Sequence, residues 1–123
     1  MMIRIVVGGQ VDKERIADKI RELAGDRVNV TVKSDIEAAM DIKTQQADYY
    51  LGACLTGGGG ALAMAIALLG MNCCATLSMP GNIRSNEEII KEIDSGKKAF
   101  GFTGQHAEHV LPVVIKHLLS KIC

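Results

Sequence analysis

The chain has no tryptophan, only four other aromatic residues and only two prolines among its 123 residues. Its fourteen basic residues balance fourteen acidic ones, so it lacks the positive surface that binds nucleic acids and anionic membranes. Long hydrophobic runs are also missing, because the longest, residues 61–69, reaches about half of the ~20 residues that a membrane span needs. These absences predict a protein with neither a nucleic-acid partner nor a membrane-inserted segment.

The cysteines and the first residues point to one compartment. Cys73 and Cys74 are adjacent in a strand-like run and would point to opposite faces, so a bridge between them would be strained. With Cys54 on a turn and Cys123 at the end of the chain, the four cysteines are typical of reduced thiols. The first residues enter a strand at once and show no signal peptide. We therefore expect a cytoplasmic protein.

Hydrophobic patterning divides the chain into alternating strands and helices. Residues 28–33 alternate apolar and polar side chains, which is typical of a strand at a sheet edge. Ser34 and Ser85 each begin a capping box, Asp12 is expected to cap the first helix, and Pro112 is expected to kink the last helix or start it afresh. The expected strands are residues 3–7, 28–33, 49–54, 73–78 and 98–102, and the expected helices are residues 12–25, 34–44, 61–69, 85–96 and 106–123.

Five strands that alternate with helices over short connections predict a single α/β domain spanning residues 1–123. Because crossovers between parallel strands are right-handed, we expect a doubly wound, five-stranded parallel sheet in three layers, with the flavodoxin-like strand order 2-1-3-4-5. In that order the winding reverses between strands 1 and 3. Folds of this kind bind ligands at the reversal, so the turns after strands 1 and 3 are the expected site.

The turn after the third expected strand contains four consecutive glycines. Their backbone N–H groups are unshielded by side chains and lie beside the positive end of a helix dipole, an arrangement that binds phosphates and oxyanions. Polar residues after strands 1, 4 and 5 open on the same edge of the predicted sheet. The predicted ligand-binding residues are Gly8, Gly9, Gln10, Thr56, Gly57, Gly58, Gly59, Gly60, Asn82, Arg84, Gln105 and His106.

Cys54 is the candidate catalytic residue, because the following helix N-terminus favours a thiolate at the end of the strand. The alternative interpretation is a small buried residue that ends the strand. The histidines do not indicate a metal site. His106 and His109 are three residues apart, but Pro112 disturbs that segment, His117 is two turns further on, and no Cys/His spacing matches a zinc site. We expect neither a metal nor a cofactor.

Four segments together resemble the bacterial YhfU-like family, whose function is unknown. They are residues 47–54, residues 56–67, Met79-Pro80-Gly81 and residues 99–102. The resemblance runs over essentially the whole chain. It implies a small bacterial cytoplasmic protein and supplies no activity.

Residues 54–59, Cys-Leu-Thr-Gly-Gly-Gly, are similar to the Cys-Gly-Thr-Gly-x-Gly turn of B-type ribose 5-phosphate isomerases, which share the doubly wound architecture. This resemblance implies a sugar-phosphate ligand, with Cys54 as the base and Thr56 and the N–H groups of Gly57 to Gly59 stabilising the enediolate. Those enzymes carry an Asp-His pair after strand 1, where this chain has Gly8-Gly9-Gln10, and a C-terminal extension that this shorter chain lacks. The sequence thus predicts a binder of a small anionic or phosphorylated molecule, with an aldose–ketose isomerase as the alternative.

The helix after the glycines has no charged or polar side chain from Ala61 to Leu69. In a monomer it should show a polar outer stripe, as the helices that begin at Ser34 and Ser85 do. An exposed apolar stripe is a liability in water, and small residues such as Ala63 and Ala67 let a second backbone approach closely. We therefore expect a symmetric homodimer with this helix at or near the interface.

Overall fold

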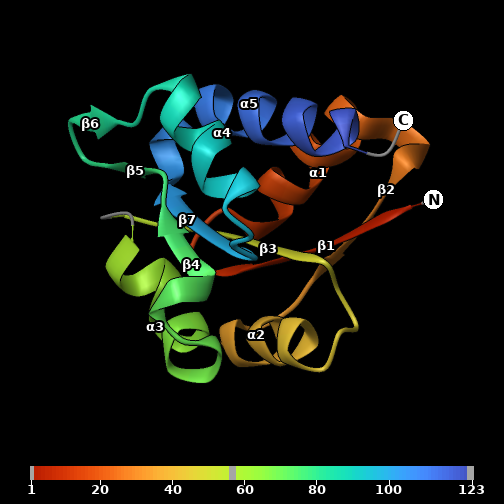
Figure 1. Ribbon diagram of the computed structural model, residues 1–123, viewed down its shortest axis with the longest axis vertical. Coiled ribbons are helices and arrows are strands. Elements are labelled where there is room, and N and C mark those ends of the chain that lie inside the picture. Colours follow the sequence, from red (N-terminus) through yellow and green to blue (C-terminus); the bar gives the residue numbers. More distant parts are fainter. Residues whose placement is uncertain (1, 56–57, 122–123) are drawn as a thin grey trace.

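A computed structural model of the chain describes residues 2–55 and 58–121. Within these residues, five parallel strands form the main sheet and five α-helices cover it (Figure 1). The strands are β1 (Ile3–Gly9), β2 (Val28–Val32), β3 (Tyr49–Cys54), β4 (Cys74–Thr76) and β7 (Ala99–Thr103). The helices are α1 (Lys13–Ala24), α2 (Asp35–Lys43), α3 (Gly58–Leu69), α4 (Asn86–Asp94) and α5 (Ala107–Ser120). Short 3₁₀ helices, η1 (Gly25–Arg27), η2 (Met71–Cys73) and η3 (Gly104–His106), precede β2, β4 and α5.

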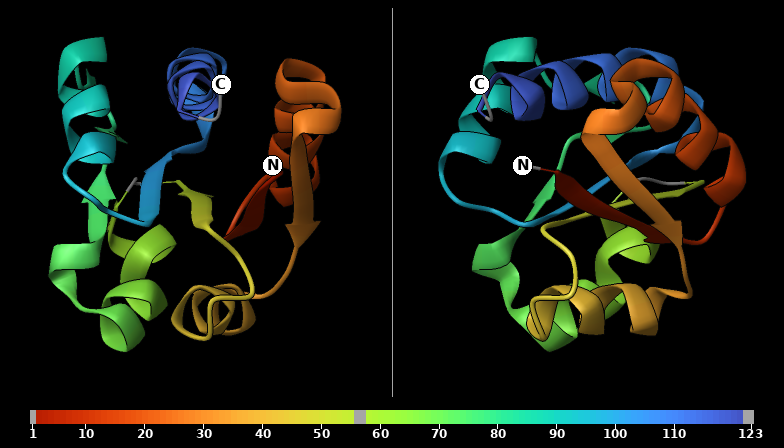
Figure 2. Two further views of the ribbon diagram at one scale, coloured as in Figure 1. Left: turned by 45° about the vertical axis from the view of Figure 1, so that its right-hand side comes forward. Right: turned by 90° about the vertical axis from the view of Figure 1, so that its right-hand side faces the viewer.

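The sheet is the middle one of three layers. Helices α1, α4 and α5 pack on one face, and α2 and α3 pack on the other (Figures 1 and 2). Each face has its own apolar core, with Phe100 and Phe102 buried on the α1 and α5 side and Tyr50 buried on the α2 and α3 side. The predicted doubly wound, three-layer α/β architecture is confirmed.

The strand order is β2-β1-β3-β7-β4, so the predicted order 2-1-3-4-5 is wrong for its last two strands. The last strand, β7, lies between β3 and β4 and is buried at every position, whereas β4 has only three residues and forms the edge. Right-handed crossovers fit this order. The chain moves outward from β3 to β4 through α3 on one face of the sheet, and it returns inward from β4 to β7 through α4 on the other face. That return carries α4 to the face of α5.

The ends of the helices agree with the sequence in two of three cases. The capping boxes at Ser34 and Ser85 are confirmed, since each serine hydroxyl accepts a hydrogen bond from the backbone N–H three residues later at 3.2 Å. Asp12 precedes α1, but its side chain makes no capping hydrogen bond, so that prediction is wrong. Its backbone is left-handed, with φ of 58°, and its carboxylate pairs with Arg15 at 3.2 Å instead.

The fourth expected strand is shorter than residues 73–78. After β4 the chain leaves the sheet at Leu77, whose N–H donates to the carbonyl oxygen of Gly101 at 2.7 Å. It then forms a small antiparallel hairpin of β5 (Ser78–Met79) and β6 (Asn82–Ile83), which projects from the body of the domain (Figure 1). The sequence did not predict this hairpin.

Helix α5 runs without interruption from Ala107 to Ser120 with Pro112 inside it, so the alternative of a fresh start at Pro112 is wrong. A proline removes one backbone donor from a helix. Here the carbonyl that loses its partner belongs to Glu108, which is exposed, so water can replace the missing N–H.

Within residues 2–55 and 58–121, no helix combines the length and apolar character needed to cross a membrane. The same part of the chain holds no group of three His, Cys, Asp or Glu side chains arranged around a metal position. Cys73 and Cys74 are free thiols, whereas Cys123 lies outside the described residues.

Candidate functional site

Three neighbouring strands, β1, β3 and β7, end at the same edge of the sheet. The winding reverses between β1 and β3, which is where doubly wound sheets bind ligands. Because β7 takes the inner position, the turn that follows it lies beside the turn after β3. The turn after β4 lies one strand further out. Residues after β7 are therefore nearer to the turn after β3 than residues after β4 are.

Gly9 holds the turn after β1 against the end of β3. Its φ is +80°, and a Cβ atom at this position would lie 2.5 Å from the backbone nitrogen of Ala53. The N–H groups of Gln10 and Val11 then donate to the carbonyl oxygen of Ala53, at 2.8 and 3.2 Å. Only glycine allows this approach of two backbones.

The first turn also contacts the glycine run. A Cβ atom at Gly60 would lie 2.6 Å from Oε1 of Gln10, so the amide of Gln10 occupies the space that a side chain at residue 60 would need. Two of the segments predicted to converge therefore do meet, through Gln10 and Gly60.

Helix α3 begins at Gly58, three residues before the predicted start at Ala61. The first four N–H groups of a helix have no partner within it, so those of residues 58–61 make no hydrogen bond inside α3. Gly58, Gly59 and Gly60 place no side chain over them. Thr56 and Gly57, which were also predicted to bind the ligand, lie outside the described residues.

Cys54 and Thr103 end neighbouring strands and lie directly opposite each other in the sheet. Both residues are 2% exposed. The N–H of Thr103 donates to Oγ of Ser78 at 3.0 Å, but the buried hydroxyl of Thr103 has no hydrogen-bond partner among the described residues.

The hydroxyl of Thr103 lies on the side of β7 that faces α3. A Cβ atom at Gly101 would lie 2.7 Å from Cγ of Leu62, and alternate residues of a strand share one face. Thr103 is two residues beyond Gly101, about 7 Å along the strand. The crossover helix α3 runs antiparallel to the strands, so its start lies toward their carboxyl ends. Gly58 precedes Leu62 by one helical turn and therefore lies about 6 Å nearer to that edge of the sheet. Thr103 is therefore level with the start of α3.

Tyr50 connects the first turn to α3 beneath this edge. Its hydroxyl accepts a hydrogen bond from the N–H of Gly9 at 3.0 Å and donates one to the carbonyl oxygen of Ala61 at 2.6 Å. Burial, with a smaller effect from the nearby Asp35 carboxylate, raises the pKa of Tyr50 well above its ordinary value. The hydroxyl therefore stays protonated and keeps both hydrogen bonds.

A hollow of about 370 Å³ opens at the carboxyl ends of β1 and β2. It is lined by Gly9, Lys13, Ser34, Asp35, Ile36 and Met64. Oδ1 of Asp35 is buried and has no hydrogen-bond partner among the described residues. Burial raises the pKa of Asp35, and the charge of Lys13 and the N–H of Gly9 act in the opposite direction. The hollow thus combines a carboxylate that has one unsatisfied oxygen with an ammonium group.

The two predicted residues after β7 lie in η3, next to the same edge. Gln105 is exposed, whereas His106 is half-buried, and its Nδ1 is buried with no hydrogen-bond partner among the described residues. This 3₁₀ helix is fixed to α1, because the guanidinium of Arg15 in that helix donates to the carbonyl oxygen of Gly104 at 2.9 Å.

The remaining predicted residues are exposed or make other contacts. Asn82 and Arg84 are exposed on and after the hairpin, and the guanidinium of Arg84 pairs with Glu92 of α4 at 3.2 Å, on the face opposite to α3. Gly8 lies inside β1, where a Cβ atom would be 2.6 Å from the ring of Tyr50. The structure thus gives Gly8 a packing role beside Tyr50.

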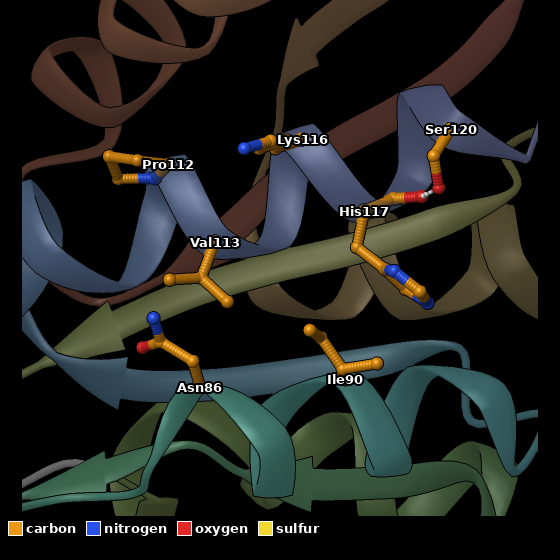
Figure 3. Close-up of a pocket in the computed structure, with 7 residues that line it drawn as sticks. All are labelled: Asn86, Ile90, Pro112, Val113, Lys116, His117 and Ser120. Atoms are coloured by element: carbon orange, nitrogen blue, oxygen red, sulfur yellow. Dashed lines mark hydrogen bonds between the residues drawn. The ribbon is translucent and has the colours of Figure 1, made fainter.

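A second hollow, of about 360 Å³, lies between α4 and α5 on the outer surface (Figure 3). Its lining residues are Asn86, Ile90, Pro112, Val113, Lys116, His117 and Ser120. Nε2 of His117 is 2.8 Å from a carboxylate oxygen of Asp94, so this imidazole is already paired. We assign the candidate site to the sheet edge, where buried polar atoms without partners gather.

Sequence reasoning missed Asp35 and Tyr50. Asp35 was read only as part of a capping box, although Ser34 and Glu37 alone explain that motif. The order of β2 and β1 offered a usable signal, because the residues after adjacent parallel strands open on the same edge. No sequence pattern could have shown that the Tyr50 hydroxyl joins Gly9 to Ala61.

Comparison with known sequences gives a consistent result. The profile of a family described as "Protein of unknown function DUF2620" matches residues 3–118. The chain is 44% identical over 117 residues to an uncharacterized protein YhfU from Escherichia coli K12 and to one from Shigella flexneri. Each alignment covers 95% of this chain and 99% of the relative. The resemblance to the YhfU-like family is confirmed.

Comparison with solved structures shows the same fold in another group of proteins. Two structures of the type B ribose 5-phosphate isomerase of Trypanosoma cruzi superpose with a TM-score of 0.68. One matches 96% of this chain and 84% of its own at 14% identity, and the other matches 94% and 83% at 13% identity. Likeness at this identity establishes a shared fold.

Proposed function

We propose that this chain, which belongs to the family described as protein of unknown function DUF2620, binds a small anionic or phosphorylated metabolite where α3 begins. The anion accepts hydrogen bonds from the N–H groups at the start of the helix, and the helix dipole adds a favourable field. Gly58, Gly59 and Gly60 support this proposal, because they begin α3 without side chains that would block an approaching phosphate.

The observation that carries the proposal is the hydroxyl of Thr103. It is buried, has no hydrogen-bond partner among the described residues, and lies level with Gly58. A buried hydroxyl without a partner costs about 1–3 kcal/mol of stability. That cost is offset if the hydroxyl donates to a bound anion, so the ligand explains a group that folding alone does not.

A phosphorylated sugar is the ligand class that the comparisons favour. The structural neighbours are ribose 5-phosphate isomerases by name, and they share the doubly wound sheet and its carboxyl edge with this chain. D-ribose 5-phosphate and inorganic phosphate are therefore the probes of choice for binding measurements.

Replacing Thr103 with valine tests the proposal. Valine keeps the branched shape and removes the hydroxyl, so we expect phosphate binding, measured by titration calorimetry, to weaken about tenfold or more. The free energy of unfolding should stay the same or rise, because a hydroxyl without a partner has been removed. The control is Thr31→Val on the edge strand β2, which should leave binding unchanged. Equal phosphate affinity in wild type and Thr103→Val would refute the role of this hydroxyl.

The alternative function is an aldose–ketose isomerase with Cys54 as the base. Its support is the position of Cys54, directly opposite Thr103 at the end of β3, together with the fold shared with the isomerases. The thiol is 2% exposed, so a substrate must contact it from the start of α3. Conversion of ribose 5-phosphate to its ketose by wild type, and its loss in Cys54→Ser, would establish this alternative over binding alone.

The reduced thiols support a cytoplasmic location. Cys73 and Cys74 are both free thiols. Proteins of oxidising compartments commonly pair their cysteines in disulfides, whereas a reducing compartment keeps them as thiols.

We also propose that α3 forms the interface of a symmetric homodimer. Ala63 and Ala67 are exposed on the helix, and no residue from Ala61 to Leu69 is polar. Leu55 precedes the helix and is 77% exposed, and Met71 follows it and is 74% exposed. A second copy of α3 would cover this apolar surface and bring two ligand sites close together.

The double variant Ala63→Glu, Ala67→Lys tests the dimer. The two new side chains can pair with each other four residues apart, so the helix itself should keep its stability. In a dimer, however, they would introduce charges into the apolar contact. We expect wild type to sediment as a dimer at micromolar concentration and the variant as a monomer. A monomeric wild type contradicts the proposal.

A further inference from the structure

Asp35 has one carboxylate oxygen, Oδ1, that neither the fold nor the proposed phosphate site uses. It is the first residue of α2, yet the helix is capped by Ser34, and Oδ1 of Asp35 remains buried without a partner among the described residues. Such an oxygen destabilises the folded state unless a bound molecule donates to it. Asp35 as a residue lines the hollow of about 370 Å³ at the ends of β1 and β2.

Lys13 supplies the second polar group of this hollow. Its Nζ donates to the carbonyl oxygen of Lys33 at 2.9 Å, which fixes the ammonium group and leaves two of its N–H bonds for other acceptors. Lys13 also lies close enough to Asp35 to oppose the effect of burial on the pKa of that carboxyl group. The hollow therefore holds one fixed donor, the ammonium of Lys13, and one acceptor, the carboxylate of Asp35.

The hollow adjoins the start of α3. Its wall includes Met64, which is one helical turn, about 6 Å, beyond Gly60. Gly9 borders the hollow as well, and the residue after it contacts Gly60. Helices α2 and α3 lie next to each other on this face of the sheet (Figure 1). A short carbon chain can therefore extend from the phosphate position into the hollow.

We propose that the Lys13–Asp35 hollow binds the hydroxyl groups of a polyhydroxylated phosphate ester whose phosphate lies at the start of α3. This inference rests on the proposed function. Sugar hydroxyls donate to the carboxylate of Asp35 and accept from the ammonium of Lys13, and each carbon between them contacts the apolar walls of Ile36 and Met64.

Charge selects hydroxyls over other groups. A second phosphate would be repelled by the carboxylate of Asp35, and a cationic group would be repelled by the ammonium of Lys13. A neutral group that both donates and accepts satisfies Asp35 and Lys13 together, and vicinal hydroxyls provide it. The hollow thus makes binding specific for the hydroxylated part of the ligand, in addition to its phosphate.

The test compares inorganic phosphate with D-ribose 5-phosphate on wild type and on Asp35→Asn, by titration calorimetry. Wild type should bind the sugar phosphate about tenfold or more tightly than phosphate, because the hollow adds hydrogen bonds. Asp35→Asn should remove most of this advantage and leave the affinity for inorganic phosphate unchanged within about twofold. Lys13→Met should have the same effect on the sugar. Glu14→Gln is the control, because it removes one exposed negative charge from α1 outside the hollow.

The outcomes separate this inference from the proposed function. Equal affinity of wild type for phosphate and ribose 5-phosphate would overturn the inference and leave phosphate binding at α3 intact. An unchanged affinity for the sugar phosphate in Asp35→Asn, or an equal loss for both probes, would also overturn it. Binding of neither probe to wild type would refute the proposed function and this inference with it.

Discussion

Replacing Gly9 with alanine is expected to lower the free energy of unfolding by about 3 kcal/mol or more. Two effects add at this position. Alanine is strained at a φ of +80°, and its Cβ would lie 2.5 Å from the backbone nitrogen of Ala53. The obstacle is backbone in the middle of a sheet, so no side chain can move aside to relieve it.

Gly81→Ala is the matched control for Gly9→Ala. Gly81 has a similar φ of +76°, but a Cβ atom there meets nothing within 4 Å. Alanine at this turn should cost about 1 kcal/mol, the conformational penalty alone. Urea denaturation of both variants measures the difference, which isolates the close approach of β1 to β3. Equal losses in the two variants would contradict the described packing of Gly9 on Ala53.

Tyr50→Phe should lower the free energy of unfolding by about 2–4 kcal/mol. The hydroxyl satisfies two buried backbone groups, the N–H of Gly9 at 3.0 Å and the carbonyl of Ala61 at 2.6 Å. Phenylalanine keeps the ring and leaves both groups without a partner. Because Ala61 lies in the first turn of α3, the variant should also weaken phosphate binding.

Tyr49→Phe is the control for Tyr50→Phe. It separates the loss of the Tyr50 hydrogen bonds from the general effect of removing a phenolic hydroxyl. Tyr49 is half-buried, its ring lies 6.3 Å from that of Phe100, and the ammonium of Lys98 lies 5.2 Å from its centroid. Phenylalanine preserves both contacts, so the change should stay within about 0.5 kcal/mol. Thermal and chemical denaturation test the pair. A loss of stability in Tyr50→Phe no larger than in Tyr49→Phe would refute the bridging role.

Local features of this fold could be predicted from the sequence because they depend on neighbouring residues. The capping boxes at Ser34 and Ser85 need only a hydroxyl and a glutamate three residues later, and both are present. The edge position of β2 follows from the alternation of buried Val28 and Val30 with exposed Asn29. In each case the determining contacts lie within a few residues along the chain.

The exchange of β4 and β7 could not be predicted in the same way. Alternating strands and helices specify a parallel sheet, but several strand orders satisfy right-handed crossovers. The inner position of β7 depends on contacts between distant residues, such as the packing of Leu62 against Gly101. The composition Ala-Phe-Gly-Phe-Thr is compatible with an inner strand and does not require it.

The part of the candidate site that depends on neighbouring residues could be predicted, and the part that depends on the order of the last two strands could not. The glycine run is a local signal, and the start of α3 at Gly58 agrees with it. Asn82 and Arg84 were included because the turn after the fourth strand was expected beside the glycines, whereas β7 takes that place. Asp35 begins α2 directly after β2, and the adjacent order of β2 and β1 places it beside Gly9. The expected order of these two strands already contained this signal.

The central claim is that an anion binds where α3 begins, and an NMR titration of isotope-labelled protein with inorganic phosphate tests it most directly. We predict saturable shifts that are largest for the backbone amides of residues 58–61 and for Thr103. They should be absent from the variant Gly58→Val, Gly59→Val, in which two side chains cover the amides and the remaining spectrum shows a folded domain. Saturable shifts that persist unchanged in this variant, or no saturable shift in wild type, would contradict the account.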